Sequence, residues 1–259
     1  MTLEGIEDRF DREIERLGVR IKDMDQLKVR DDVFDEITLL SLYKLIHKKW
    51  ISAMGGPIST GKEANVFSGE RGDEHIAIKI YRIRTANFNA MSDYIIGDRR
   101  FSGIKRTRKG IIFAWTKKEY SNLARAHAAG VPVPVPIIWD RNILVMQFLG
   151  KDDRPYPQLK NVELEDPGEV YHEIIGSMKM LFQGAELVHA DLSEFNILIG
   201  DKPYVIDMGQ SVTRDHPGAY EFLKRDIRNI NRFFSGLCEV HEDRVVFTEV
   251  TGHGTVVMA

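Results

Sequence analysis

Two polar segments in the second half of the chain constrain its fold more than any other sequence feature. The first runs Val188-His-Ala-Asp-Leu-Ser-Glu-Phe-Asn196, and the second, Asp207-Met-Gly209, begins eleven residues after it. Short apolar runs, Ile197–Ile199 and Tyr204–Ile206, flank both segments and predict short strands. The polar groups are therefore expected in loops beside these strands, where functional side chains commonly lie.

The spacing of these residues is similar to that of the catalytic and metal-binding loops of protein kinases, HxDxxxxN followed by DxG. Phosphoryl transfer needs a carboxylate that accepts or orients the proton of the nucleophile, and Asp191 suits this role. It also needs oxygen ligands for Mg²⁺, which Asn196 and Asp207 can supply, while Gly209 permits a tight turn. One aspartate in a loop ordinarily caps a helix or a turn, but the combined pattern favours phosphoryl transfer.

A glycine-containing segment at 56–63 is the candidate phosphate cover. Its sequence, Gly56-Pro-Ile-Ser-Thr-Gly61-Lys62-Glu63, matches GxxxxGK, but a Walker A loop requires Ser or Thr where Glu63 stands, and it opens a helix. Here the segment leads into the strand-like run Ala64–Ser68, so a phosphate-covering hairpin fits better. Of the three glycines in the kinase pattern GxGxxGxV, this hairpin keeps one, Gly61.

A lysine on the next predicted strand is the candidate phosphate-binding cation. Ala77-Ile78-Lys79 matches the end of the kinase VAIK motif, within the strand-like run His75–Tyr81. A buried lysine needs a partner, and Glu119 on the predicted helix 111–129 is the candidate. A surface lysine and a surface helical glutamate are the alternative.

The charge of the chain is strongly polarised. The formal net charge is −3, but residues 82–118 contain ten basic and two acidic side chains, a net charge of +8 that leaves −11 on the rest. Such polarity suggests a localised interaction with an anionic partner, and a solvated loop with incidental charge is the alternative.

The order of the predicted elements indicates an α+β protein with two lobes. Residues 1–50 carry apolar side chains at helical spacing, and Asp31 or Asp32 is the expected cap of a helix with Leu39, Leu42 and Leu45. Strands dominate after Trp50. Helices follow at 111–129, 168–183 and, as the last expected element, 218–234.

The composition excludes several classes of protein. The single Cys238 rules out an intramolecular disulfide and any zinc site built on two thiolates, and the eight histidines lack metal-binding spacing. The charged amino terminus does not resemble a signal peptide, and no apolar run approaches the ~20 residues that span a bilayer. A cytoplasmic location without membrane attachment is expected.

Taken together, these motifs resemble the RIO family of atypical serine/threonine protein kinases. The resemblance covers residues 30–235 and is carried by Ser59-Thr-Gly-Lys-Glu-Ala-Asn65, His189-Ala-Asp-Leu-Ser-Glu-Phe-Asn196, Asp207-Met-Gly-Gln-Ser-Val212 with His216-Pro217, and Asp226-Ile-Arg-Asn-Ile-Asn-Arg-Phe-Phe234. The lead-in Lys79-Ile-Tyr-Arg82 and the inserted basic loop most resemble the first RIO subfamily, in its archaeal form.

The resemblance implies a trimmed protein-kinase-like fold. Its parts would be an N-terminal helical segment (1–48), an N-lobe with an antiparallel sheet and a helix (49–147), and a small, mostly helical C-lobe (148–259). A basic flexible insert would occupy 83–110. Only fifty residues follow Gly209 and no Ala-Pro-Glu motif occurs, so we expect no peptide-binding platform of the ordinary kinase type.

The resemblance also implies ATP as substrate with Mg²⁺ or Mn²⁺, serine autophosphorylation, and ATP hydrolysis in late maturation of the small ribosomal subunit. Asp191 would be the catalytic base, Lys79 the lysine that contacts the phosphates, and Asn196 and Asp207 the metal ligands. Glu119 keeps its expected catalytic part as the partner of Lys79. The implied nucleotide-binding residues are Ser59, Thr60, Gly61, Lys62, Glu63, Ala64, Val66, Lys79, Met146, Gln147 and Phe148. Met146 would guard the adenine pocket, and the backbone near Gln147 would bind the adenine edge.

Three positions bear on these roles. Ala190 stands where Gly is usual in the family, and Gln147 stands where Glu is expected at the hinge. Like the family, and unlike ordinary kinases, the chain has Ser193 where a lysine contacts the transferring phosphate, so slow turnover is expected.

Two alternatives to a protein kinase remain open at this stage. One is a nucleotide-gated module that binds RNA or pre-ribosomes, supported by the basic segment. The other is a small-molecule kinase of the aminoglycoside-phosphotransferase kind, although residues 150–168 leave little room for its substrate lobe. The expected autophosphorylation sites are Ser92, Ser102 and Thr107, because they lie in the basic insert.

Overall fold

The computed structural model describes residues 33–83, 91, 94–95, 98–101, 103–104, 107–151 and 153–252. Contacts divide the chain into two compact units: the first contains residues 1–90, 104–117 and 136–148, and the second contains 91–103, 118–135 and 149–259. The predicted helix before residue 33 and half of the basic insert, with Ser92 and Ser102, lie outside the described residues.

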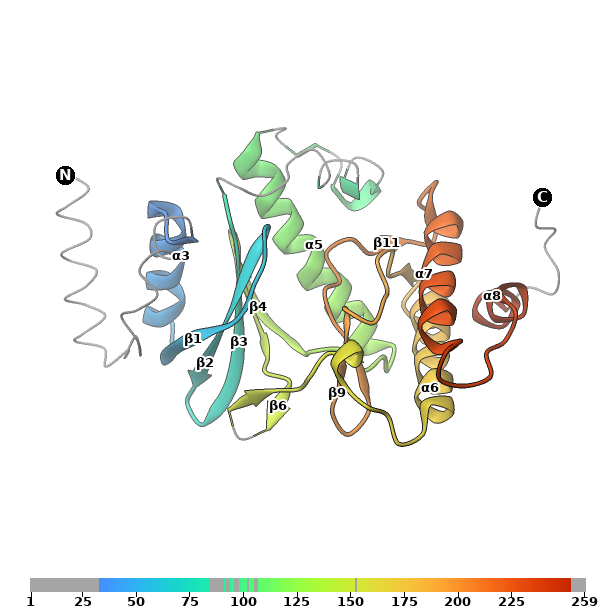
Figure 1. Ribbon diagram of the computed structural model, residues 1–259. Helices are drawn as coiled ribbons and strands as arrows, with labels where there is room; N and C mark the ends of the chain where they lie inside the picture. Colours follow the sequence, from blue (N-terminus) through green and yellow to red (C-terminus); the bar gives the residue numbers. More distant parts are fainter. Residues whose placement is uncertain are drawn as a thin grey trace. The chain divides into compact units, whose positions relative to one another are not determined.

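The first unit is built on an antiparallel sheet of five strands in the order β1-β2-β3-β5-β4 (Figure 1). Its strands are β1 (Ala53–Thr60), β2 (Ala64–Arg71), β3 (Glu74–Tyr81), β4 (Pro136–Asp140) and β5 (Ile143–Gln147). β3 is the central strand and reads as an almost continuous buried run, Ile76 to Tyr81, because both of its faces are covered. The predicted antiparallel sheet is confirmed.

Helix α3 (Glu36–His47) packs on one face of this sheet. Its side chains Leu42 and Leu45 join a buried cluster with Ile76, Ile78 and Ile80, which alternate along β3 and so share a face. Asn142 Nδ2 donates to Thr38 Oγ1 at 2.8 Å, which links α3 to the turn before β5.

The second unit is mostly helical. Its helices are α6 (Pro167–Lys179), α7 (Ala219–Phe234) and α8 (Asp243–Thr251), and a π-helical turn (Met180–Gly184) extends α6. Four two-residue strands and two three-residue strands form three small hairpin-like sheets: β6 (Gly150–Lys151) with β7 (Arg154–Pro155), β8 (Leu187–Val188) with β11 (Val212–Thr213), and β9 (Ile197–Ile199) with β10 (Pro203–Val205). Single 3-10 turns lie at Arg99–Phe101 and Leu159–Asn161.

The long helix α5 (Arg108–Ala128) contributes to both units, since the division falls at Lys117. Thr107 precedes the helix, and its Oγ1 accepts from the Gly110 N–H at 3.1 Å. After the helix, Gly130 has a left-handed conformation with φ +82°. The α+β class predicted from the sequence is confirmed.

Several local predictions were wrong. The cap of α3 is Asp35, whose carboxylate accepts from the Thr38 N–H at 2.9 Å, and neither Asp31 nor Asp32 takes this role. Strands β1 and β4 were not predicted; each contains a proline, at 57 and 136, and has a register shift beside it. Helix α7 is not the last element, since α8 follows it.

The unit boundaries also differ from the predicted domain limits of 48 and 147. Residues 91–103 and 118–135 group with the second unit, and 104–117 with the first. The domain limits stay a prediction, because contact units need not coincide with domains that fold independently. Within the described part of the chain, no helix is long and apolar enough to cross a membrane.

Candidate active site

The three residues expected to carry phosphoryl transfer come from two loops of the second unit. Asp191 and Asn196 lie in the loop between β8 and β9, and Asp207 lies in the loop between β10 and β11. The pairing of β8 with β11 and of β9 with β10 places these loops side by side. A backbone bond from the Ile206 N–H to the Asn196 carbonyl, 3.0 Å, joins them directly.

The Asp191 carboxylate is held by two amides. Gln210 Nε2 donates to Asp191 Oδ2 at 2.9 Å, and Asn196 Nδ2 lies 3.4 Å from the same oxygen. Asn196 Nδ2 also donates to the Asp191 carbonyl at 2.8 Å, which closes the loop on itself. The structure therefore brings Asp191 and Asn196 together, and it adds Gln210, to which the sequence reasoning gave no role.

Burial raises the pKa of Asp191 above its ordinary value, and the negative charge of Asp207 raises it further. The Arg225 charge and the Asn196 hydrogen bond oppose this effect without cancelling it. Two carboxylates that repel each other in a partly buried loop form a site that a cation would stabilise.

This donor set fits Mg²⁺, which prefers one or two carboxylates and otherwise keeps water or substrate oxygens as ligands. The Asn196 amide lies next to the Asp191 carboxylate and could supply its oxygen as a further ligand; this role stays a prediction. Among the residues that the structure describes, no group of three or more His, Cys, Asp and Glu side chains could hold a metal ion.

Asp226 on α7 holds the backbone of the candidate catalytic loop, the segment between β8 and β9 that contains Asp191. The carboxylate is buried and accepts two backbone hydrogen bonds, from Ala190 N–H at 2.8 Å and from Leu192 N–H at 3.0 Å. These two residues flank Asp191, so the carboxylate fixes the backbone on either side of the candidate base. Burial raises the pKa of Asp226 to about 7, although the two N–H donors oppose the shift.

Two further contacts shape the catalytic loop. His189 bonds to the Ile206 carbonyl through Nε2 at 2.9 Å and accepts from the Asp191 N–H through Nδ1 at 3.3 Å, so both ring nitrogens contact backbone groups of the two loops. Ala190 has φ +68°, a left-handed conformation that favours glycine. This strain agrees with the expectation of a glycine at this position, and the contacts of Asp226 hold the backbone there.

In the first unit, the candidate phosphate cover is the turn between β1 and β2. The Gly61 N–H donates to the Ala64 carbonyl at 2.9 Å, and Ser59, Thr60, Gly61 and Lys62 are exposed. A Cβ at position 61 would lie 3.0 Å from that carbonyl oxygen, so glycine permits the close approach of the two strands. Because Glu63 and Ala64 lead into β2 and not into a helix, the segment is not a Walker A loop.

Three of the candidate nucleotide-binding residues of the sheet, Val66, Lys79 and Met146, share one face. Lys79 lies opposite Val66 on β2 and opposite Leu144 on β5, and Met146 lies opposite Ala77. Alternation along β3 puts this face on the side away from α3. Lys79 is 7% exposed, and its ammonium lies 5.2 Å from the centre of the Tyr81 ring.

The hinge that would bind adenine already uses some of its backbone groups. The Phe148 N–H donates to the His75 carbonyl at 3.5 Å, and the Leu149 carbonyl accepts from the Tyr156 N–H at 3.0 Å. Gln147 pairs with Ile76, so its side chain points to the α3 face of the sheet, away from that of Met146. Its expected contribution through backbone atoms stays a prediction.

Glu119 is 1% exposed on α5, in the part of the helix that belongs to the second unit, whereas Lys79 belongs to the first. Both side chains are buried, so the alternative of two surface residues is wrong. Their pairing stays a prediction.

Comparison with known proteins places these features in context. The family model described as "RIO domain" matches residues 65–244, more than half of the chain. The RIO-type serine/threonine-protein kinase Rio1 of Haloferax volcanii is 47% identical over 228 residues, covering 87% of this chain and 78% of that protein. The same enzyme of Methanocaldococcus jannaschii is 41% identical over 229 residues, covering 87% and 79%.

Longer relatives and solved structures agree. Human serine/threonine-protein kinase RIO1 is 42% identical over 221 residues, which are 83% of this chain but 39% of that protein. The Rio2 kinase of Chaetomium thermophilum superposes with a TM-score of 0.64 at 22% identity, covering 94% of this chain and 77% of that chain. Its ADP/Mg²⁺-phosphoaspartate complex superposes with a TM-score of 0.63 at 23% identity, covering 84% and 67%. The predicted kinase-like fold is confirmed.

Proposed function

Because this chain belongs to the RIO family of atypical protein kinases, in its Rio1 subfamily, we propose that it transfers the γ-phosphoryl group of ATP to serine or threonine hydroxyls with Mg²⁺. The observation that carries the proposal is the arrangement of Asp191, Asn196 and Asp207 in two adjacent loops. Mn²⁺ is an alternative ion, because the same oxygen ligands suit it. The family membership favours a protein kinase over a small-molecule kinase.

Each residue has a defined task in this proposal. Asp191 accepts the proton of the attacking hydroxyl, and Gln210 and Asn196 keep its carboxylate oriented. Asn196 and Asp207 would hold the metal ion, which neutralises phosphate charge when it is bound. The turn at Gly61 would cover the phosphates with its backbone, and Lys79 would contact them as a cation.

Isosteric substitutions test this assignment. Asp191→Asn and Asp207→Asn are compared with wild type in single-turnover assays with [γ-³²P]ATP, and label is followed in the protein itself, in an added acceptor protein and as free phosphate. We expect Asp191→Asn to lower transfer to hydroxyls by about 100-fold or more, because a positioned base contributes ~10²–10⁴ in rate.

Asp201→Asn is the control, since Asp201 is an exposed carboxylate in the β9–β10 turn that accepts a hydrogen bond from the Tyr204 hydroxyl at 2.8 Å. Label found only as free phosphate in wild type would refute the protein-kinase assignment and favour an ATP hydrolase. Undiminished transfer by Asp191→Asn would refute the role of Asp191. We further propose that self-labelling falls on Ser92, Ser102 or Thr107, of which Thr107 is exposed at the start of α5.

A second proposed function is binding of precursors of the small ribosomal subunit, with ATP hydrolysis as a timing step, in the cytoplasm. The net charge of +8 over residues 82–118 supports it, since Lys and Arg clusters dominate affinity for RNA phosphates. Two of these charges are committed inside the protein: Lys118 is buried, and Arg100 pairs with Asp98 at 2.6 Å. Binding to ribosomal RNA is therefore expected to weaken steeply with salt, and binding that is insensitive to salt would contradict this account.

A further inference from the structure

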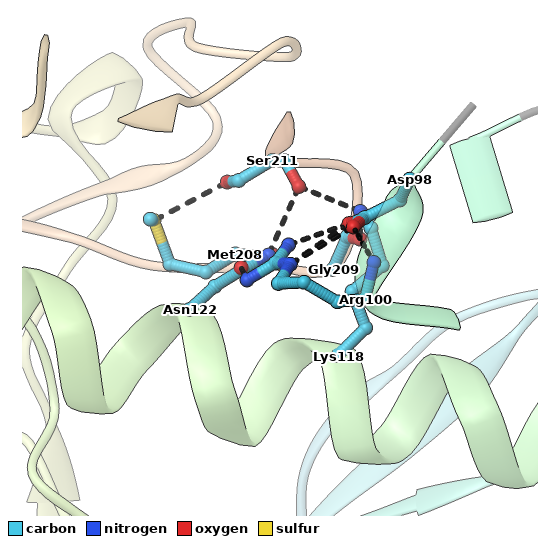
Figure 2. A network of polar contacts seen from close by, with 7 residues as sticks. All are labelled: Asp98, Arg100, Lys118, Asn122, Met208, Gly209 and Ser211. Carbon is cyan, nitrogen blue, oxygen red and sulfur yellow. Dashed lines mark hydrogen bonds and ion pairs between the residues drawn. The ribbon is translucent and has the colours of Figure 1, made fainter. Parts of the chain in front are cut away.

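Two side chains of α5 donate hydrogen bonds to the backbone that follows the candidate metal ligand Asp207 (Figure 2). Lys118 Nζ donates to the Gly209 carbonyl at 2.7 Å and to the Ser211 carbonyl at 2.6 Å. Asn122 Nδ2 donates to the Met208 carbonyl at 2.8 Å and to the Ser211 carbonyl at 3.0 Å. Residues 118 and 122 lie one helical turn apart, so both project from the same face of α5.

The residues that form these hydrogen bonds are fully buried. Lys118, Asn122, Met208 and Ser211 each have 0% exposed surface, so their hydrogen bonds do not compete with solvent. Hydrogen bonds in such surroundings are strong, and a buried donor that loses its acceptor is costly. The four bonds therefore restrict the backbone of residues 208–211 to one arrangement.

Asp207 stands directly before this restricted segment. Its φ is +62°, a left-handed conformation that residues other than glycine rarely adopt, while its side chain is exposed. Such a conformation persists only where the surrounding structure enforces it. The contacts of Lys118 and Asn122 begin at the next residue and provide that enforcement.

Residues of the basic insert complete the network. Arg100 Nη1 donates to Asn122 Oδ1 at 2.9 Å, which orients the Asn122 amide, and Arg100 also pairs with Asp98 at 2.6 Å (Figure 2). Asp98 is 3% exposed, and the Lys118 ammonium lies 6.0 Å from the centre of the Tyr94 ring. The network thus runs from the insert, through α5, to the loop of Asp207.

We propose that Lys118 and Asn122 are positioning residues that aim Asp207 at the metal ion, and that the Asp98–Arg100 pair orients Asn122 for this task. The inference rests on the proposed function, because it assumes that Asp207 binds Mg²⁺. Groups that orient a metal ligand typically contribute 10–100-fold to metal affinity. A rearrangement of the insert would change the metal affinity of the site through the same contacts.

The test measures the Mg²⁺ concentration that half-saturates ADP binding to the full chain, by calorimetry at fixed protein concentration. Lys118→Met removes the ammonium and keeps the apolar stem, and we expect the half-saturating concentration to rise about tenfold or more. Lys117→Met is the matched control, because the neighbouring lysine is exposed on the same helix, and we expect less than a twofold change. Arg100→Met, whose side chain is 25% exposed, is expected to cause a smaller rise of a few-fold.

The outcomes separate this inference from the proposed function. If wild type binds ADP with no dependence on Mg²⁺, both fail. If wild type shows the dependence and Lys118→Met has the same half-saturation, positioning by Lys118 is refuted while the proposed function stands. Thermal unfolding without ligand identifies a variant that is only destabilised: a lower melting temperature with unchanged Mg²⁺ half-saturation indicates a purely structural role. If Lys118→Met does not fold, Arg100→Met tests the proposal in its place. An unchanged Mg²⁺ half-saturation of ADP binding in Arg100→Met would refute the coupling between the insert and the metal site.

Discussion

Replacement of Asp226 by asparagine should change how the stability of the protein depends on pH. The Asp226 carboxyl is 1% exposed, and burial raises its pKa from 3.8 in the unfolded chain to about 7 in the folded protein. Between these values the unfolded chain has lost this proton and the folded protein has kept it. The contribution of Asp226 to the free energy of unfolding is therefore fully present below pH 3.8, and it is lost as the pH rises toward 7.

The size of the effect follows from the width of this interval. Each pH unit within it lowers the free energy of unfolding by about 1.4 kcal/mol, so the two units from pH 5 to pH 7 amount to roughly 3 kcal/mol. Asparagine does not titrate, and Asp226→Asn lacks this dependence. It also presents an N–H group to one of the two backbone donors at Ala190 and Leu192, which adds a penalty of about 1–3 kcal/mol that does not vary with pH.

Urea unfolding of wild type and Asp226→Asn at pH 5 and pH 8 measures both quantities. Subtracting the two proteins at each pH removes the titration of every other group. We expect the advantage of wild type to shrink by about 3 kcal/mol between pH 5 and pH 8. Glu221→Gln is the control on the same helix, since its ion pair with Lys224 is exposed and worth less than about 1 kcal/mol. A difference that stays constant with pH would refute the reasoning, because it would mean that the N–H donors and Arg225 outweigh burial.

Two further predictions concern the first unit. A Cβ at Gly69 would lie 2.9 Å from the Ala53 carbonyl oxygen, which the backbone holds in place, and 2.7 Å from Ile78 Cδ1. Gly69→Ala should therefore destabilise the sheet by about 1–3 kcal/mol, measured by urea unfolding against Gly56→Ala, whose Cβ would meet no atom within 4 Å. Asn142→Leu should lower the free energy of unfolding by about 1–3 kcal/mol in the same assay. It removes the buried amide that donates to the Thr38 hydroxyl of α3 and to the Tyr81 carbonyl of β3. A decrease below about 0.5 kcal/mol would contradict the anchoring role of this amide.

The candidate catalytic residues could be identified from the sequence because their signal is local, and their roles stay predictions. Asp191 and Asn196 are five positions apart, and the loop that holds them is closed by a hydrogen bond between them. The strands beside this loop are short and apolar, so their pattern was readable as well. Strands β1 and β4 were not predicted, since a proline in an edge strand leaves the same local signal as a proline in a loop.

The residues that support the site could not be predicted in this way. Asp226 contacts a loop 34 and 36 positions away, and Lys118 contacts carbonyls 91 and 93 positions away. In the sequence Asp226 is one of two acidic residues on its helix, and nothing near it reveals which backbone groups it will meet. Gln210 is close to Asp207, but its bond to Asp191 spans 19 positions and depends on how the two loops pair.

Lys117 and Lys118 show the difference between what the sequence determines and what only the tertiary structure decides. The sequence by itself determined that a phosphoryl-transfer motif, a phosphate-covering hairpin and a strongly basic segment occur together in an α+β chain. From the sequence, the two adjacent lysines of that segment are indistinguishable, because each counts as one positive charge. Tertiary structure decided that Lys117 is exposed while Lys118 is 0% exposed and bound to the loop of Asp207. The reason is geometric: neighbouring residues on a helix point about 100° apart, and only packing determines which direction faces the interior.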